Sequence, residues 1–118
     1  MSDTPALVVI EKLGNAVIAH VNVKLLDEAG LKLLGQLIDQ SAGEPGVSLV
    51  VVDLSGVRLI PSLGLGVLIQ ISSKCKARGQ SLKLAATPPP IRQVFAITRL
   101  DRVLEMADSV EAATRSPV

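Results

Sequence analysis

A serine followed by two glycines stands where an apolar run gives way to a segment with helical spacing. The aliphatic stretch of residues 49–54 leads through a short loop to Ser62, Gly64 and Gly66. A hydroxyl and the unpaired N–H groups of a first helical turn would meet at the surface there, and such a turn attracts negative charge. The junction is therefore a candidate for recognition or for chemical modification.

Other residue types that could do chemistry are few. Asp27 and Asp53 could form a pair for general acid and base catalysis, but Asp27 is placed to cap a helix and Asp53 closes a strand. No histidine or second nucleophile is placed by the sequence to work with them. His20 is expected to be a structural or edge residue, and Cys75, the single cysteine, a small core residue. We therefore predict no enzymatic activity, no metal site of the usual Cys/His kind and no cofactor.

The composition argues against two further classes of function, nucleic-acid binding and membrane insertion. The chain has 118 residues, of which 48% are hydrophobic and 19% charged, so a single packed domain over residues 1–118 is expected. A net charge of +1 and one aromatic residue, Phe95, argue against nucleic-acid binding. No apolar run approaches the roughly 20 residues that span a bilayer, so no membrane insertion is expected. The lone cysteine fits the reducing cytoplasm.

Strand-length apolar runs alternate with longer segments of helical spacing along the chain. A hairpin is expected at Gly14-Asn15, and the valine-rich run 49–54 is expected in the sheet centre. The pattern predicts an α/β fold with a mixed sheet. Its expected strands are 7–10, 16–23, 49–54, 82–86 and 103–107, and its helices follow Asp27, cover 62–78, follow Pro88 to Pro90, and cover 110–115 after a cap at Asp108 or Ser109.

Three pieces of sequence, in this order of elements, resemble one known family. They are residues 51–57 with 62–68, residues 25–27 at the opening of the first helix, and residues 100–104 with 108–113. Together they resemble the STAS domain, the family of sulfate transporters and anti-sigma factor antagonists, over essentially the whole chain. The resemblance implies a sheet of about five strands flanked by about four helices.

Because no transporter-like segment precedes these pieces, the resemblance points to the stand-alone anti-sigma factor antagonists. Such proteins bind an anti-sigma factor, often a serine protein kinase, and so release a sigma factor to direct transcription. They are controlled by phosphorylation of a Ser or Thr at the start of the second helix. The resemblance thus implies a cytoplasmic protein-binding domain, a monomer or weak dimer, with an anti-sigma factor as its partner.

The chain departs from the family at this phosphorylation site. The usual pattern is an acidic residue, two hydroxyl residues and Gly-Leu-Gly, with the phosphate on the second hydroxyl. Here Pro61, Ser62 and Leu63 occupy those places, so the acceptor position holds a leucine and only Ser62 remains. Ser62 can be read as a helix N-cap or as a displaced phosphoacceptor, and both roles can hold together.

The second helix supplies a further hypothesis. A helical projection puts Ser62, Leu65, Ile69, Ser73 and Lys76 on a stripe opposite the core face. We expect Leu65 and Ile69 to anchor a protein partner, unless a neighbouring element covers the stripe. The expected partner-binding residues are Asp27, Pro61, Ser62, Leu63, Gly64, Leu65, Gly66 and Ile69.

Two other functions stay open. The chain could be a soluble STAS subunit or scaffold of a larger signalling or transport assembly, as some family members are. It could also sense a small molecule or nucleotide, although the Gly64-x-Gly66 pair lacks the Lys-Ser/Thr that follows a phosphate-binding loop.

Overall fold

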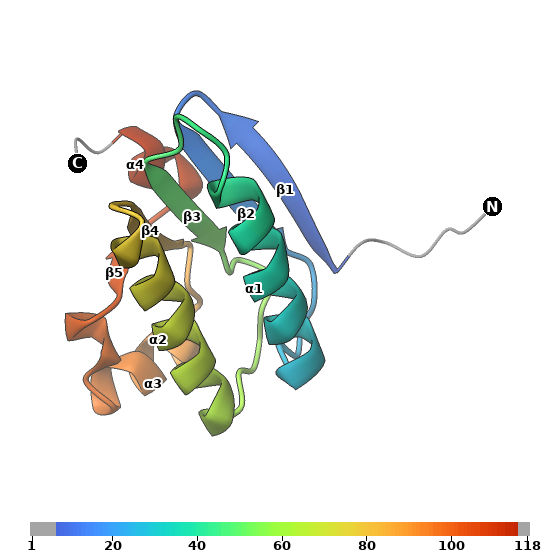
Figure 1. Ribbon diagram of the computed structural model, residues 1–118. Coiled ribbons are helices and arrows are strands. Elements are labelled where there is room, and N and C mark those ends of the chain that lie inside the picture. The colour runs from blue at the N-terminus through green and yellow to red at the C-terminus, as the bar shows by residue number, and fades with distance from the viewer. Residues whose placement is uncertain (1–6, 116–118) are drawn as a thin grey trace.

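The computed structural model describes residues 7–115, which form one five-stranded sheet with helices on both faces (Figure 1). The predicted bounds 1–118 also include residues 1–6 and 116–118, which lie outside the described part. The strands are β1 (Val8–Leu13), β2 (Ala16–Val21), β3 (Leu49–Asp53), β4 (Ser81–Ala85) and β5 (Glu105–Ala107). The helices are α1 (Glu28–Ala42), α2 (Ser62–Ala77), α3 (Pro89–Ile97) and α4 (Val110–Arg115), with a 3-10 turn at Leu100–Arg102.

The strands follow one another in the sheet in chain order. β1 pairs with β2 antiparallel, and every later pair is parallel, so the sheet is mixed as predicted. The hairpin turns at Gly14, whose φ of 60° suits a residue without a side chain. The predicted α/β class and the STAS-like arrangement of about five strands and four helices are confirmed.

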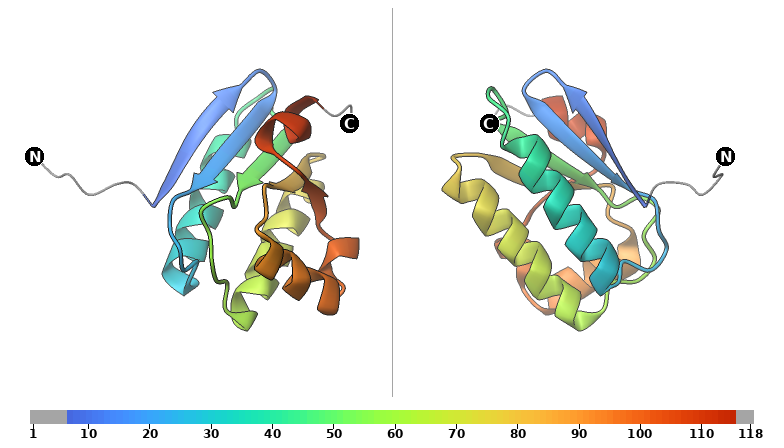
Figure 2. Two further views of the ribbon diagram at one scale, coloured as in Figure 1. Left: turned by 180° about the vertical axis from the view of Figure 1, so that it is seen from behind. Right: turned by 45° about the vertical axis from the view of Figure 1, so that its right-hand side comes forward.

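The central strand shows why a valine-rich run belongs between two layers. Side chains alternate across β3, so Val50 and Val52 pack in the main core with α1, α2 and α3, whereas Val51 packs in a smaller core under α4. All three are fully buried. The two views of Figure 2 show α1 and α2 on one face of the sheet and α4 on the other.

The last strand is shorter than predicted. The last strand begins at Glu105 rather than at residue 103, because the Leu100–Arg102 turn occupies the approach to it. Of the two predicted caps for α4, Ser109 is in use, since its Oγ accepts the N–H of Ala112 at 3.0 Å.

The parallel strands bring three loops to one end of the molecule. The carboxyl ends of β2, β3 and β4 and the amino ends of α1, α2 and α3 all lie at the lower end in Figure 1. In doubly wound and related α/β folds this is the end where ligands are bound. The loop between β3 and α2, with Ser62 and its glycines, lies there.

Candidate functional site

The loop from β3 to α2 is held in place at its start and in its middle. At its start, Oδ1 of Asp53 accepts the N–H of Ser55 at 3.0 Å, and the N–H of Leu54 donates to the carbonyl of Ala85 at 3.0 Å. In its middle, Val57 is fully buried and its N–H donates to Leu54 at 2.9 Å. The backbone of this part of the loop is therefore tied to the sheet and the core.

A short ladder joins this loop to the segment that precedes α1. The carbonyl of Lys24 accepts the N–H groups of Arg58 and Leu59 at 2.7 and 3.0 Å, and Leu26 donates back to Leu59 at 2.9 Å. Leu25 and Leu59 form an isolated parallel bridge, and both side chains remain exposed. Two leucines from separate loops are thereby placed side by side on the surface.

The first turn of α2 differs from the expectation for Ser62. The N-cap residue is Pro61, with extended φ and ψ of −61° and 153°, and no side chain caps the helix. Ser62 is the first helical residue, so its predicted role as N-cap is wrong. A proline fixes a φ that suits entry into a helix, and here it moved the cap one residue ahead of the hydroxyl. Ser62 remains exposed at the start of α2.

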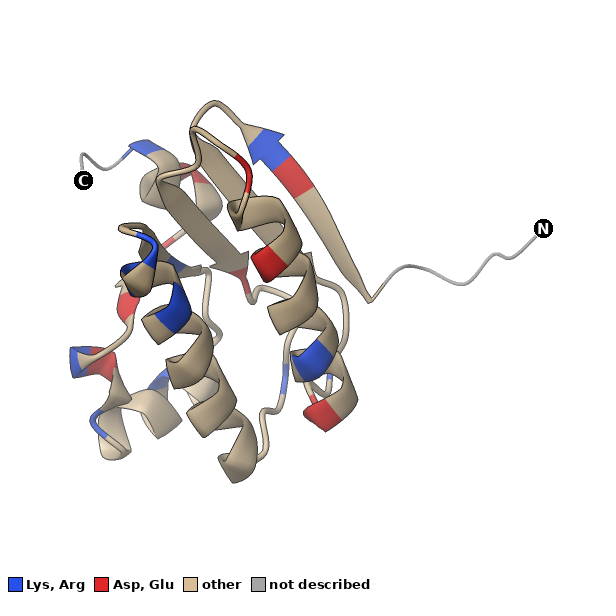
Figure 3. Cartoon of the chain, viewed as in Figure 1, with Lys and Arg blue, Asp and Glu red and all other residues tan. Residues whose placement is uncertain are grey.

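Leu63 is the most exposed large apolar side chain in the described chain. It stands in the first turn of α2 with 90% of its surface accessible. No charged residue occurs in α2 before Lys74, so this half of the helix is uncharged (Figure 3). Leu63 thus presents an apolar knob at a helix start whose amides no side chain caps.

The two glycines near Leu63 have different surroundings, and only one of them is required by packing. A Cβ on Gly64 would lie 2.5 Å from Cδ1 of Leu31 and 3.0 Å from Cγ2 of Ile60, so Gly64 lets α2 approach α1 and its own loop. A Cβ on Gly66 would meet nothing within 4 Å. Gly64 is required by packing, whereas packing leaves Gly66 free to vary.

Leu65 is not on an exposed stripe. Only 7% of its surface is accessible, and it packs in the main core, which corrects the helical projection. The projection assumed one buried face, but α2 lies between α1 and the start of α3. Leu65 lines a groove against Pro90, Ile91 and Val94. Ile69 is half-buried, so it too presents less surface than expected.

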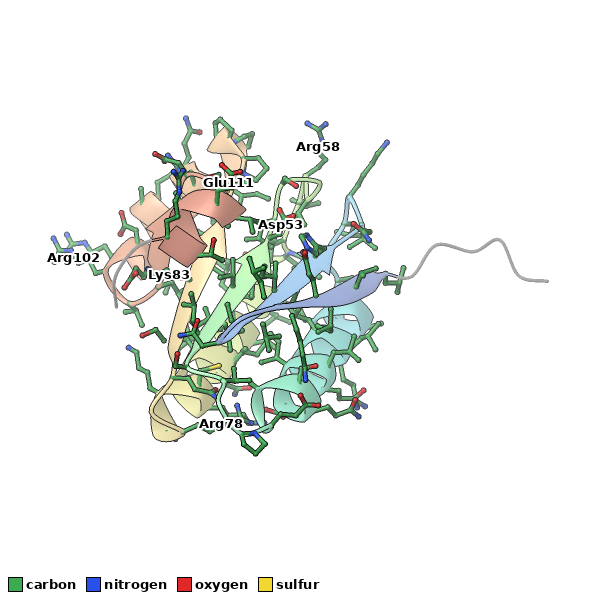
Figure 4. The ribbon with its side chains drawn as sticks, turned by 90° about the horizontal axis from the view of Figure 1, so that it is seen from above. Asp53, Arg58, Arg78, Lys83, Arg102 and Glu111 are labelled. Atoms are coloured by element: carbon green, nitrogen blue, oxygen red, sulfur yellow. The ribbon has the colours of Figure 1, made fainter. Side chains whose placement is uncertain are left out.

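We use the name apolar end for the exposed apolar residues of the two joined loops, of the first turn of α2 and of α3, which are Leu25, Leu59, Leu63, Val94 and Ile97. Its central feature is the groove, of about 190 Å³, between the β3–α2 loop and α3. Arg58 also lines this groove, and Figure 4 shows its side chain extending away from the sheet. Such a surface suits an apolar protein segment far better than a small charged ligand.

Asp27 lies two residues after Leu25 of the apolar end, and its carboxylate already accepts a hydrogen bond within the fold. Its Oδ1 accepts the N–H of Gly30 at 2.9 Å and caps α1, which confirms the predicted cap. The carboxylate is thus part of the helix start, and its expected contact with a partner would be made from the exposed side of that cap.

Sequence reasoning missed one cluster of ionisable groups. His20 was expected to be a structural or edge residue, and no histidine was expected to work with Asp53. In the structure Nδ1 of His20 lies 2.8 Å from Oδ2 of Asp53, and Nε2 lies 2.8 Å from Oε1 of Glu11. The contacts come from strand register, with His20 opposite Asp53 on the neighbouring strand. Asp53 was the available signal, because a carboxylate at the end of a parallel strand reaches the next strand's side chain.

These contacts change the pKa values of both partners. The hydrogen bond to Glu11 and then that to Asp53 raise the pKa of His20 above its usual 6.5, against an opposing effect of burial. Burial acts to raise the pKa of Asp53, but the N–H of Ser55 and the His20 ring outweigh it and hold that pKa below its usual range. Within residues 7–115, no group of three or more His, Cys, Asp and Glu side chains is arranged to hold a metal ion.

Comparisons with known proteins match this geometry. The STAS domain family matches residues 8–113. The structure is similar to an anti-sigma factor antagonist from Mycobacterium paratuberculosis, with a TM-score of 0.77 and 21% identity over 91% of this chain and 89% of that one. It is also similar to the phosphorylated form of the Bacillus cell fate determinant SpoIIAA, with a TM-score of 0.69 and 18% identity over 92% and 97% of the two chains.

A third similar structure belongs to a much larger protein. The murine anion transporter Slc26a9 matches 88% of this chain but only 18% of its own, with a TM-score of 0.75 and 15% identity. At such identities the shared feature is the fold. No helix within residues 7–115 is both long and apolar enough to cross a membrane. Since the family match extends over most of the sequence, this chain belongs to the STAS domain family.

Proposed function

We propose that this STAS domain is an anti-sigma factor antagonist that binds its partner through the apolar end. The observation that carries the proposal is Leu63, 90% exposed in the first turn of α2, together with the other exposed aliphatic side chains of the apolar end. Similar structures that are themselves anti-sigma factor antagonists support the role. On this view the domain acts by binding and performs no catalysis.

The partner we propose is an anti-sigma factor with a serine-kinase-like domain, engaged by partner switching in the cytoplasm. Binding it would free a sigma factor and so regulate transcription. The expected contact residues were Asp27, Pro61, Ser62, Leu63, Gly64, Leu65, Gly66 and Ile69. Of these, Leu63 offers the largest apolar contact, whereas the buried Leu65 shapes the groove from below.

Ser62 is the proposed phosphoacceptor, displaced by one residue from the family position that Leu63 fills. Its side chain is exposed and makes no capping hydrogen bond to the helix. It stands at the amino end of α2, a helix of 16 residues, where the helix dipole is positive. A phosphate there would bring about two negative charges next to Leu63 and oppose docking of an apolar surface. Incubation with the partner kinase and ATP, followed by mass spectrometry, should give phosphate on Ser62 and none in Ser62→Ala.

The binding proposal is tested by pull-down from lysate of the source organism with tagged domain. Leu63→Glu is the binding variant, since a glutamate in the first turn is favourable for a helix and should not disturb folding. Leu13→Glu is the matched control, because Leu13 is an exposed leucine on β1, outside the apolar end. An anti-sigma factor recovered with wild type and Leu13→Glu but lost with Leu63→Glu supports the proposal. Equal recovery with all three contradicts the site.

The second candidate is a subunit or scaffold of a larger assembly. The similarity to a segment of the murine anion transporter favours it, and so does a leucine at the family's phosphate position. Recovery of transporter or scaffold subunits in the same pull-down would support this function, and no phosphate on Ser62 would then be needed.

A further inference from the structure

One cluster of titratable groups contains none of the proposed contact residues. The ring of His20 lies between two carboxylates, 2.8 Å from Asp53 through Nδ1 and 2.8 Å from Glu11 through Nε2. The three residues come from β2, β3 and β1 in turn, so one imidazole joins three neighbouring strands. β1 is one of the two edge strands of this sheet, and Glu11 lies within it.

The charges around the ring are negative on both sides. Glu11 and Asp53 are the charged groups that act on His20 within the described chain. On the same face, α4 packs against β3, β4 and β5, and its Glu111 pairs with Arg115. The buried Lys83 of β4 is directed to the carbonyl of Ala113 and to Glu105 instead (Figure 4).

Both contacts can be made together only by the charged ring. An ionised carboxylate accepts hydrogen bonds and donates none, so each ring nitrogen must carry a proton. The raised pKa of His20 agrees with this demand. When the ring loses one proton, a nitrogen lone pair faces a carboxylate, and that contact becomes repulsive.

Burial decides which contact is lost. Only 16% of the Asp53 side chain is accessible, and Oδ1 of that carboxylate is already held by the N–H of Ser55. The Glu11 side chain is 53% accessible and can turn into water. The remaining proton should therefore stay on Nδ1, next to Asp53, which has less freedom to move.

We propose that His20 is a pH-operated clamp on the edge strand β1. As imidazolium it joins Glu11 to Asp53, and when Nε2 loses its proton it releases Glu11 while keeping Asp53. The clamp is a property of the sheet and stands apart from the proposed binding function.

The sign of the pH effect follows from the direction of the shift. Since the folded pKa of His20 is raised, the clamp's stabilisation is fully present below the ordinary value of 6.5 and is lost as pH rises through the folded pKa. The lowered pKa of Asp53 affects stability in a different pH range, because its contribution disappears only in acid, as pH falls through that folded pKa. The clamp should thus close in mildly acidic solution and open in alkaline solution.

Nuclear magnetic resonance titration of isotope-labelled protein tests the clamp directly. The midpoint of His20 should lie above 6.5 in wild type and move down in Glu11→Gln and in Asp53→Asn. Above that midpoint, nitrogen shifts should report the Nδ1–H tautomer. A wild-type midpoint at or below 6.5, or a neutral ring protonated on Nε2, would overturn the proposal.

Urea unfolding over about pH 5 to about pH 8, extended until the ring is neutral, gives the energetic test. Each unit by which Glu11→Gln lowers the midpoint must appear at low pH as a tenfold loss in the folding equilibrium constant, fading above the midpoint. Glu44→Gln is the matched control, since the Glu44 side chain is half exposed and pairs with Lys12, which lies on β1 next to Glu11. Its effect should not vary across this range, and a parallel loss in Glu11→Gln would contradict the clamp.

Discussion

The helices α1 and α2 begin at the same end of the sheet, but their first turns are built differently. α1 is capped by Asp27, whose carboxylate accepts the N–H of Gly30, and it carries the acidic Glu28 in its first turn. α2 follows Pro61, has no side-chain cap and no acidic residue, and exposes Leu63. In α1 a side chain accepts one N–H of the first turn, whereas in α2 no side chain does so, and the Gly64 N–H is bound only by the carbonyl of Pro61.

The difference indicates where this domain meets other molecules. A side-chain cap satisfies one of the free N–H groups of a first turn, and an acidic residue there offsets the positive end of the helix, so such a start attracts outside acceptors less. An uncapped start next to an apolar groove can be completed by a partner's side chains or by a phosphate. The difference therefore favours α2 over α1 as the contact element, and four experiments test it.

The largest effect should come from Leu65. Leu65→Ala removes a buried side chain between α2 and α3 and should lower the free energy of unfolding by about 2–5 kcal/mol. Leu63→Ala, two residues earlier, should change it by less than about 0.5 kcal/mol because Leu63 is exposed. Urea denaturation measures both. Similar losses for the two variants would mean that Leu63 is covered in solution, and the apolar end would no longer be a free surface.

The next largest difference is expected between substitutions of the two glycines of α2. Gly64→Ala forces a methyl group against Leu31 and Ile60 and should cost about 1–3 kcal/mol of stability. Gly66→Ala meets no atom and should gain up to about 1 kcal/mol from helix propensity. Opposite signs in thermal unfolding are the expected outcome. A stabilising Gly64→Ala would show that α1 and α2 can separate at little cost.

A direct comparison of the helix starts uses Asp27→Ala and Ser62→Ala. Loss of the α1 cap should cost about 0.5–2 kcal/mol. Ser62→Ala should stay within about 0.5 kcal/mol, because Ser62 caps nothing. Chemical denaturation of both variants in one buffer gives the difference. An equal cost at Ser62 would restore that residue as a helix cap and weaken its proposed availability for phosphate.

The smallest expected effect sharpens the comparison by making α2 begin as α1 does. Pro61→Asp adds a capping carboxylate worth about 1 kcal/mol but removes the rigidity of proline, worth about 0.4–1 kcal/mol. The net change in stability should therefore be near zero, while partner recovery in the pull-down falls. A variant that binds as well as wild type would show that the open start of α2 is not needed for docking.

Local sequence signals predicted the elements well because each depends on neighbouring residues. The valine-rich run became the central strand, Gly14 turned the hairpin, and Asp27 capped the first helix. The same reasoning failed at Ser62, where a preceding proline took the cap position from a better capping residue. Competition between two adjacent signals was decided by backbone geometry.

The candidate site was predicted in place but not in detail. Leu63 and the β3–α2 junction were expected at the surface, and they lie there. Leu65 was misplaced because periodicity describes one helix, whereas its burial depends on α3, more than twenty residues later in the chain. The His20 cluster was missed because nine residues separate it from Glu11 and 33 from Asp53.

By itself, the sequence determined the order of strands and helices, the α/β class and the uncharged first half of α2, since these depend on composition and local periodicity. Only the tertiary structure decided which side chains of α2 are covered, why Gly64 must lack a Cβ, and that His20 meets two carboxylates. The physical reason is that burial and ionisation respond to atoms brought close by strand register and helix packing. Neither strand register nor helix packing can be derived from the spacing of neighbouring residues.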